Sequence, residues 1–386
     1  MRRSSSYDLV IAGAGIVGAS TAWHAVQLGL RVAVIDAKGP AAAASGASDG
    51  AVSVASKRPG LMADLAGASL LYTGQLAQPA NILSGIFHPR PTYLFARSEP
   101  EAQALDRLIA VLRDQASPVS LVRDGAPADA TVRGLGSVVS RVVELTGEGH
   151  MLGYLATLAY LKAAGCTTMW PAALASFETG QESIRVETSL GELHCSRLVL
   201  AAGTGTGALL PDLPLVPRSG QLIVTERSAS PADILPGPLT SAAYLLDKTR
   251  NGAGAAGTPV VIDPLETGQL LIGSSRQDHG TERSTDVHTV RRILRSAVDC
   301  LPQIAERRIL RVFSGVRAAT SDGLPIVGAL KDRPGVYCAT GFEGDGICLS
   351  ALIGREVAAL VATGKTTVDL SPLSPSRFSD KKRLSA

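Results

Sequence analysis

The fold of this chain is decided by the stretch Asp8-Leu9-Val10-Ile11-Ala12-Gly13-Ala14-Gly15-Ile16-Val17-Gly18 together with Arg31-Val32-Ala33-Val34-Ile35-Asp36. The two segments predict a buried strand, a glycine turn, a helix of small residues and a second strand that ends in an acid. Gly13 allows the tight turn, Gly15 lets the backbone approach a pyrophosphate, and Gly18 lets the helix pack against the strand. Because each flanking element of the glycine motif is in place, we expect a dinucleotide at the amino end.

The residues that follow the turn also fit a dinucleotide. A helix that begins at Ile16 and Val17 offers unpaired N–H groups and a positive dipole end to phosphates. Asp36, with its neighbour Ala37, stands where a carboxylate accepts the ribose hydroxyls. The same negative charge would repel a 2'-phosphate, so NADP is disfavoured and FAD or NAD remains.

Composition excludes several classes of protein. The chain has 386 residues, 45% of them hydrophobic, so it can bury a large core that we expect to be split over two domains. Its formal charge of +3, from 37 basic and 34 acidic residues, is too balanced to indicate a nucleic-acid partner. Its 5 cysteines include no C-x-x-C pair, which argues against a disulfide framework or an iron–sulfur site and favours a cytoplasmic location. We expect no metal site, and no uninterrupted apolar stretch reaches the roughly 18 residues of a membrane helix.

A loop rich in Ala, Ser and Gly, 40–60, follows the acid-bearing strand. Backbone N–H groups in such a loop can converge on phosphate or ribityl oxygens, so we interpret it as a segment that wraps the cofactor. A flexible surface loop of the same composition is the alternative. Its candidate cofactor contacts are Ser45, Gly46, Ser48, Asp49 and Gly50.

An apolar run over 197–203 predicts a strand that is buried on both faces. It follows a helix predicted over 153–164 and a hairpin that turns at 189–191. The carboxyl end of the strand, Ala202 and Gly203, would lie close to the ligand, unless this is a core strand without ligand contact.

Other segments indicate a second domain. The strand 92–96 and the amphipathic helix 99–113 begin it, and the half-buried strands 216–226 and 270–273 continue it. A further helix is predicted over 284–300. Together these segments favour a mainly antiparallel sheet.

The last informative block, 311–348, runs through strands and clustered glycines into a helix over 349–361. It places a second helix N-terminus at the ligand, where it can stabilise negative charge on a reduced ring. Because NAD enzymes seldom return to the ligand at the C-terminus, this block favours FAD over NAD. Its candidate cofactor contacts are Gly341, Gly344, Asp345, Gly346 and Ile347.

These motifs resemble the FAD-dependent D-amino-acid and glycine oxidase family over most of the chain. Besides the N-terminal fingerprint, the resemblance rests on Arg218-Ser219-Gly220-Gln221, Gly273-Ser274-Ser275-Arg276, Asp322-Gly323-Leu324-Pro325-Ile326-Val327-Gly328 and Gly341-Phe342-Glu343-Gly344-Asp345-Gly346-Ile347. The Glu343-Gly344-Asp345-Gly346 form and Ser56-Lys57-Arg58-Pro59-Gly60 are most similar to FAD-bearing catalytic subunits of multi-subunit dehydrogenases. These are the B subunit of opine oxidase above all, hydrogen cyanide synthase, and D-hydroxyproline or proline dehydrogenases.

The resemblance implies an α/β fold, in which a Rossmann-like FAD-binding domain of the D-amino-acid oxidase type carries a second, mainly antiparallel-sheet domain for the substrate. We expect the FAD-binding domain to be discontinuous, and the expected bounds are 1–85, 145–213 and 311–366 for that domain, 86–144 and 214–310 for the substrate domain, and 367–386 for a C-terminal tail.

The resemblance also implies oxidation of a carbon–nitrogen bond in an amino acid or secondary-amine acid, with an opine such as octopine or nopaline favoured. Hydride transfer to flavin would give an imine that water hydrolyses to an amino acid and a 2-keto acid. Arg317 matches the position whose guanidinium forks onto the substrate carboxylate, and a structural ion pair with Asp322 is its alternative. Tyr244 is a second carboxylate contact or a core tyrosine. Glu343 stands where relatives often carry a histidine, and it could attract the basic end of an opine.

As partners, the resemblance implies a larger nucleotide-binding alpha subunit and a small iron–sulfur subunit, and it is compatible with an FMN at a subunit interface. Alternative substrates are D-amino acids, D-hydroxyproline or proline, and glycine. The rival functions are a stand-alone oxidase, an NAD-dependent dehydrogenase and an assembly subunit that retains FAD without catalysing a reaction.

Overall fold

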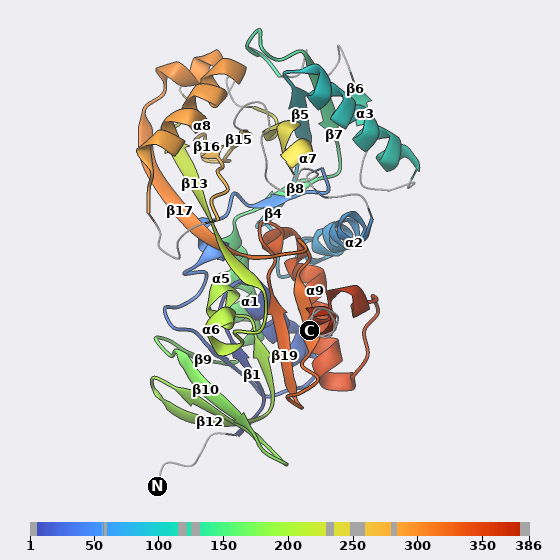
Figure 1. Cartoon of the computed structure of the whole chain (residues 1–386), viewed down its shortest axis with the longest axis vertical. Coiled ribbons are helices and arrows are strands. Elements are labelled where there is room, and N and C mark those ends of the chain that lie inside the picture. Colours follow the sequence, from blue (N-terminus) through green and yellow to red (C-terminus); the bar gives the residue numbers. More distant parts are fainter. Residues whose placement is uncertain are drawn as a thin grey trace, which may run out of the picture.

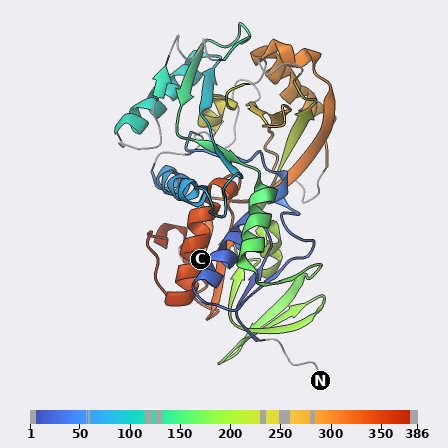
Figure 2. The ribbon, with the colours of Figure 1, turned by 180° about the vertical axis from the view of Figure 1, so that it is seen from behind.

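The computed structural model describes residues 6–55, 57, 60–114, 122–124, 132–228, 235–247, 259–278 and 284–378. Ser56, Arg58 and Pro59 of one resemblance motif lie outside these residues, as do 379–386 of the predicted tail. The described chain forms two lobes, each built around an 8-stranded sheet (Figure 1). The first described strand and the last described helix, with its following turns, belong to the lobe of the glycine motif, which the view from behind also shows (Figure 2).

The first sheet carries the glycine motif. Its strands are β1 (Ser6–Ala12), β2 (Val32–Ile35), β9 (Thr167–Met169), β10 (Leu174–Thr179), β11 (Ile184–Thr188), β12 (Gly191–Leu200), β18 (Ile326–Ala329) and β19 (Val336–Thr340). The order is β10-β11-β12-β1-β2-β9, with β19 beside β12 and β18 beside β19. β1 pairs in parallel with β2 and β12, so their carboxyl ends meet at one edge. The hairpin arm and the apolar strand predicted separately form one strand, β12.

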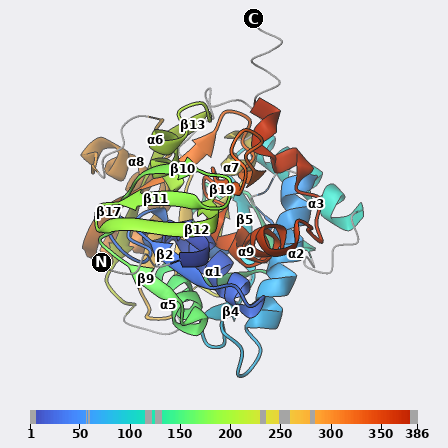
Figure 3. The same cartoon turned by 90° about the horizontal axis from the view of Figure 1, so that it is seen from below.

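Four helices cover this sheet and the space between the lobes: α1 (Ile16–Gln27), α2 (Leu61–Leu76), α5 (Gly153–Ala164) and α9 (Gly346–Thr363). α1 packs against both α5 and α9, and α9 also packs against α2 (Figure 3). By length and composition α9 could cross a membrane, but 67% of this 18-residue stretch is buried inside the protein, as expected of a core helix.

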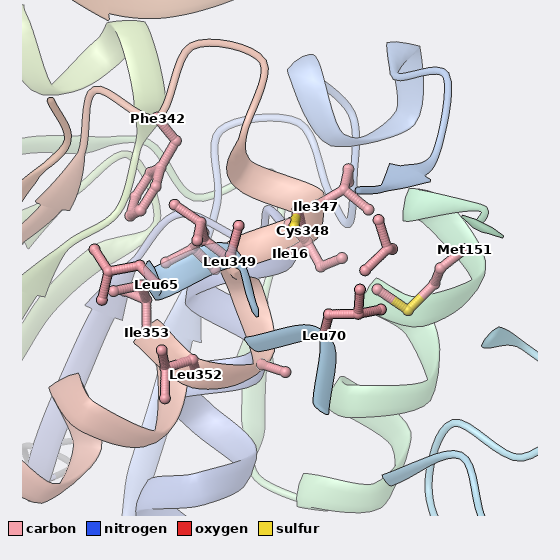
Figure 4. Packing of buried hydrophobic residues seen from close by; sticks show 14 of the residues in the cluster. Ile16, Leu65, Leu70, Met151, Phe342, Ile347, Cys348, Leu349, Leu352 and Ile353 are labelled. Atoms are coloured by element: carbon pink, nitrogen blue, oxygen red, sulfur yellow. The ribbon is translucent and has the colours of Figure 1, made fainter. Parts of the chain in front are cut away.

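The largest hydrophobic core lies between these helices (Figure 4). Ile16 of α1, Leu65 and Leu70 of α2, and the α9 residues Leu349 and Ile353 are all buried there. With only 4% aromatic residues in the chain, aliphatic side chains provide most of this core. The start of α1 and the start of α9 are therefore fixed relative to each other by packing.

The second sheet builds the other lobe. Its order is β17-β13-β16-β15-β14-β5-β7-β6, and only the β14–β5 pair is parallel. The strands are β5 (Thr92–Ala96), β6 (Val122–Asp124), β7 (Arg141–Leu145), β13 (Leu215–Thr225), β14 (Leu239–Ser241), β15 (Val261–Pro264), β16 (Leu270–Gly273) and β17 (Ile309–Thr320). The helices here are α3 (Glu99–Asp114), α7 (Ala243–Asp247) and α8 (Val287–Cys300), whose N-cap Asp286 accepts bonds from the amides of His288 and Thr289.

The position of β17 differs from the sequence-based domain assignment, which placed residue 311 onward in the FAD-binding domain. β17 pairs with β13 along nearly its whole length, so it is an edge strand of the second sheet. The two strands run from one lobe to the other (Figure 1). A residue near the carboxyl end of β17 therefore lies at the junction of the lobes.

Short elements complete the described chain. A 3-stranded sheet of β3 (Ala51–Val52), β4 (Phe87–Pro89) and β8 (Gly149–Met151) lies between the lobes (Figure 1). The remaining helical turns are η1 (Ala44–Ala47), η2 (Gly203–Gly205), α6 (Thr206–Leu209), η4 (Pro302–Glu306), η5 (Ser371–Leu373) and η6 (Pro375–Phe378).

Candidate cofactor and substrate site

The glycine turn after β1 is too crowded for side chains. Gly13 has φ +121°, and a Cβ there would overlap the carbonyl of Ala201 and lie 2.9 Å from the amide of Ala202. A Cβ on Gly18 would overlap the carbonyl oxygen of Gly13. Both glycines therefore have the roles that the sequence predicted, a tight turn and close helix packing. Ala202 lies against this turn instead of lining the cavity described below.

The N-terminus of α1 is open toward the ligand side. Its N-cap, Gly15, provides no side-chain cap, and the amide of Ile16 donates to the Ser45 hydroxyl at 3.0 Å. Ser45 thereby fixes the predicted wrapping loop to the start of the helix. Free N–H groups at a helix start bind anions, so this end of α1 fits a pyrophosphate.

Asp36, the acid at the end of β2, organises the backbone around it. Its Oδ2 accepts the amide of Ala14 at 2.8 Å, and its Oδ1 accepts the amides of Lys38 and Gly39 at 2.8 and 2.9 Å. A carboxylate offers about four acceptor positions, so capacity for a ribose hydroxyl is left. The exposed Ala37 lies beside it, and neither residue lines the main cavity.

The wrapping loop is held by groups that the sequence reasoning missed. The carboxylate of Glu148, 1% exposed, accepts the Ser53 hydroxyl and the amides of Val54 and Ala55, each at 2.8 Å. His150 contacts the carbonyl of Asp49 through Nε2 at 3.0 Å. In the described part of the loop, side chains from elsewhere in the chain therefore hold residues 49 and 53–55, which favours the wrapping segment over a flexible surface loop there.

A second helix N-terminus, that of α9, faces the same space. Its N-cap Asp345 makes no side-chain cap; its Oδ1 instead pairs with Lys57 Nζ at 2.8 Å. The Lys57 side chain is 4% exposed. Burial opposes its charge, but Asp345 and other nearby groups raise the pKa of Lys57 above its usual value. The sequence places Lys57 and Asp345 in two separate resemblance motifs, and neither motif indicates that the two residues pair.

One cavity joins these features to the second lobe. It encloses about 1590 Å³, counting its open mouth. Of the predicted cofactor residues, Gly13, Gly18, Gly46 and Gly50 do not line it, and a Cβ on each would overlap a neighbouring group. Those that line it are Gly15, Ile16, Val17, Ser45, Ser48, Asp49, Gly203, Gly341, Gly344, Asp345, Gly346 and Ile347. The three predicted catalytic residues, Arg317, Tyr244 and Glu343, line it too.

Arg317 reaches the cavity from β17. Its Nη2 lies 3.4 Å from the Ser274 hydroxyl and 3.5 Å from the Ser275 carbonyl, both neutral groups. Among the described residues no carboxylate forms an ion pair with it. Asp322, the alternative partner, pairs with Arg377 instead, Nε to Oδ2 at 2.8 Å. Burial and the nearby Arg276 lower the pKa of Arg317, as expected of a cation that lacks a direct counter-ion.

Tyr244, on α7, is 7% exposed and bonded to one residue. Its hydroxyl accepts from the amide of Ser274 at 3.1 Å and can donate to the carbonyl of the same residue at 3.2 Å. Because Ser274 also contacts Arg317, it links the two predicted carboxylate contacts. Whether Tyr244 binds substrate stays a prediction.

Glu343 has two guanidinium partners. Its Oε1 lies 3.0 Å from Arg218 Nη1 and 3.4 Å from Arg276 Nε. Burial raises the pKa of Glu343, but Arg276, Arg218 and Arg317 together lower it below its usual value. The carboxylate is therefore balanced by protein cations, which leaves it poorly suited to the predicted attraction of a substrate cation.

A different carboxylate lines the cavity from the second sheet. Asp263, on β15, is 1% exposed, and its Oδ1 lies 2.5 Å from Arg90 Nη2. Burial raises the pKa of Asp263 to about 7, although Arg90 acts in the opposite direction. No sequence motif marks Asp263, because it is a single acid within a short apolar strand.

The described residues contain no cluster of three or more His, Cys, Asp or Glu side chains that could hold a metal ion. The five cysteines are all free thiols. The site offers backbone N–H groups at two helix starts, an acid at the expected ribose position, and a cavity lined by an arginine. This arrangement defines a dinucleotide-dependent enzyme whose substrate cavity lies between two lobes.

Comparison with known proteins gives the family. Residues 8–360 match the family model described as FAD dependent oxidoreductase (DAO), and the chain belongs to this family. It is therefore an FAD-dependent oxidoreductase, and the NAD alternative is excluded. The site fits FAD in two respects. Gly13 and Gly18 allow a turn in which a side chain would clash with neighbouring backbone, and the starts of α1 and α9 have no side-chain cap, so their N–H groups can face phosphates.

Three relatives share about a quarter of their residues with this chain and match nearly its whole length. Glycine oxidase of Geobacillus kaustophilus (strain HTA426) is 25% identical over 387 residues, covering 97% of this chain and 98% of its own. Hydrogen cyanide synthase subunit HcnC of Pseudomonas aeruginosa is 24% identical over 423 residues, covering 97% and 96%. The B subunit of opine oxidase from Rhizobium meliloti is 26% identical over 388 residues, covering 96% and 97%. The crystal structure of the Geobacillus kaustophilus glycine oxidase has a TM-score of 0.86 at 24% identity, covering 97% of this chain and 99% of that chain, and confirms the predicted fold.

Proposed function

We propose that this enzyme oxidises the carbon–nitrogen bond of an amino acid or secondary-amine acid, and that an opine of the octopine or nopaline type is its substrate. The observation that carries the proposal is Arg317, a guanidinium without a carboxylate partner among the described residues, in the cavity that the cofactor turns also line. A buried guanidinium of this kind is a receptor for a carboxylate, which it can bind with two parallel hydrogen bonds.

The proposed roles of the protein are binding and orientation. Bound FAD supplies a two-electron acceptor for a hydride from the substrate α carbon. Arg317 holds the carboxylate and so fixes the α carbon relative to the first lobe, and Tyr244 supports it through Ser274. The substrate nitrogen loses a proton to solvent before the hydride leaves, and water then hydrolyses the imine to a 2-keto acid and the freed amine. No histidine lines the described cavity, and an amine that enters in its neutral form needs no side-chain base.

We also propose that the chain works as the catalytic subunit of a larger complex. Two of the relatives are named as subunits, that of opine oxidase and that of hydrogen cyanide synthase. The partners would be a larger nucleotide-binding subunit and a small iron–sulfur subunit, with an FMN at an interface as a further proposal. Glycine oxidation is the second candidate function, favoured by the glycine oxidase relatives.

Anaerobic reduction of the purified flavoprotein tests the proposed function. The visible flavin spectrum is titrated with octopine, nopaline, D-proline, D-alanine and glycine, with Arg317→Ala as the matched variant. Bleaching by opines, weakened in the variant, is the expected result. Bleaching by glycine alone would favour the second candidate, and peroxide formed without partners would identify a stand-alone oxidase. A yellow protein that none of the five reduces would contradict the proposed chemistry.

A further inference from the structure

Asp263 presents a carboxylate oxygen that the protein leaves without a partner. Its Oδ1 pairs with Arg90, whereas its Oδ2 is buried and has no hydrogen-bond partner in the part of the chain that the structure describes. The residue is 1% exposed and lines the cavity. Leaving a buried acceptor unpaired is unfavourable, so an unpaired carboxylate oxygen on a residue that lines a cavity calls for a donor that the described residues do not supply.

Strand register places two hydroxyl groups on the same wall. Thr240 of β14 pairs with Val261 of β15, and side chains two residues apart share a face, so Thr240 and Asp263 lie on one side of the sheet. The parallel pair Thr240 and Leu94 puts Thr92, two residues before Leu94, on that side as well. Thr92 and Thr240 both line the cavity, and within the described residues neither hydroxyl has a hydrogen-bond partner.

The charge balance of this wall favours a cation. Among the described residues Arg90 is the one cation that acts on Asp263, while Asp49 faces the same space with a second negative charge. The pKa of Asp263 is raised in spite of Arg90, which means that the protein under-compensates its charged form. A second positive group beside Oδ2 would remove this deficit.

A purely structural role accounts for only part of the arrangement. Arg90 ties the chain before β5 to β15, because its Nη1 also donates to the carbonyl of Pro264 at 2.6 Å. That role uses one carboxylate oxygen. It does not require the other oxygen and two threonine hydroxyls to stand unpaired along the wall of the substrate cavity.

We propose that Asp263, with Thr92 and Thr240, forms a subsite for a positively charged group of the substrate, an ammonium or guanidinium beyond the reacting nitrogen. The inference rests on the proposed function, in which Arg317 holds the carboxylate. It narrows the substrate to acids with a basic side chain, such as arginine-derived opines, and assigns the basic end to Asp263 instead of Glu343. Glycine and D-alanine cannot fill this subsite.

A pair of substrates that differ only in charge tests the subsite. Octopine is compared with its citrulline analogue, N2-(1-carboxyethyl)citrulline, in which a neutral urea replaces the guanidinium, by anaerobic flavin reduction. The wild-type protein should be half-reduced at an octopine concentration about 10- to 100-fold lower than that of the analogue, the range expected of a hydrogen bond to a charged group. In Asp263→Asn this ratio should fall toward one.

Two further variants keep the test decisive. Asp322→Asn removes a carboxylate that pairs with an arginine outside the cavity, and it should keep the wild-type ratio. If Asp263→Asn does not fold, Thr240→Val, which removes one hydroxyl at constant shape, should lower the ratio severalfold. A ratio near one in the wild-type protein, or an unchanged ratio in Asp263→Asn or Thr240→Val, overturns the subsite while leaving the proposed oxidation intact. Absence of reduction by both compounds and by all simpler amino acids contradicts the proposed function itself.

Discussion

The guanidinium of Arg317 occupies the space that Gly220 leaves empty. The two residues stand on the paired strands β17 and β13, and a Cβ on Gly220 would overlap Nη2 of Arg317 and lie 2.8 Å from the Ser275 carbonyl. Glycine at this position is therefore a condition for the arginine to reach the cavity.

Gly220→Ala should displace this guanidinium while the two strands stay paired. We expect KM for the substrate to rise about 10-fold or more, with FAD content unchanged, because the carboxylate contact is lost and Gly220 is not one of the predicted cofactor contacts. Steady-state kinetics with a dye acceptor measure this. Gly67→Ala on α2, where a Cβ meets nothing within 4 Å, is the control and should not change KM.

Replacement of Arg317 should weaken substrate binding and leave cofactor binding unchanged. Arg317→Ala should keep its FAD and raise KM by about 10- to 100-fold, because a charge-assisted hydrogen bond contributes about 1.5–3 kcal/mol. Arg317→Lys should recover only part of this, since an ammonium cannot form the two-pronged contact. A wild-type KM in Arg317→Ala would remove the residue from the carboxylate site.

Asp36 should decide how tightly FAD is held. In Asp36→Asn one of the two oxygens that accept backbone amides becomes an amide group, which cannot accept them, so the turn at Ala14 or at Lys38 loses its partner. We expect FAD affinity to fall about 10- to 100-fold, measured by reconstitution of the apoprotein. Asp8→Asn removes a carboxylate bound to the exposed Arg31 and should bind FAD normally.

The pair Lys57 and Asp345 should be coupled energetically. Lys57→Met removes the cation that lies 2.8 Å from the Asp345 carboxylate and should lower the free energy of unfolding by about 3 kcal/mol, the low end for a buried pair. The double variant Lys57→Met with Asp345→Asn should recover part of this loss, measured by urea unfolding. Additive effects of the two single changes would show that the pair is not coupled.

Two buried histidines predict a loss of stability in mild acid. Burial lowers the pKa of both His24 and His150 to about 4, below the usual value near 6.5 of an unfolded chain. The unfolded state therefore binds more protons below pH 6.5, and stability falls as pH drops from about 6.5 to 4, by about 3 kcal/mol for each histidine.

The measurement is thermal unfolding between pH 7 and 5, where most carboxylates keep their charge. His24→Gln and His150→Gln should each flatten the pH dependence. Asp263, with its raised pKa, acts in the opposite direction, since it gains protons on folding in this range. For this reason the informative quantity is the difference in Tm between each variant and the wild-type protein at each pH. Parallel curves for all three proteins would contradict the burial argument.

The elements that carry local patterns were predictable. α5 and β5 have the predicted bounds, α3 differs by one residue at its end, and α9 begins three residues before its prediction. The glycine turn could be recognised because its function depends on backbone conformation, and a glycine at a fixed spacing from a strand and a helix reports that conformation directly.

What depends on contacts between distant segments had to come from the tertiary structure. β17 reads as a strand in the sequence, but its alternation does not say that its partner is β13 in the second sheet. In the sequence Glu343 has no visible partner, and only the fold brings Arg218 and Arg276 to it. Asp263 likewise has no distinguishing feature in the sequence, and its place beside the threonines depends on the pairing of β5, β14 and β15.

The sequence by itself determined that the chain builds a dinucleotide-binding unit, and its second glycine-lined helix start indicated FAD. The role of Arg317 at a substrate carboxylate was predicted from the family resemblance. Tertiary structure decided which charges in the cavity are balanced and which are available to a substrate. The physical reason is the separation along the chain of the residues involved. Backbone geometry is set by neighbouring residues, whereas the charge that a carboxylate presents depends on cations that folding brings from far along the chain.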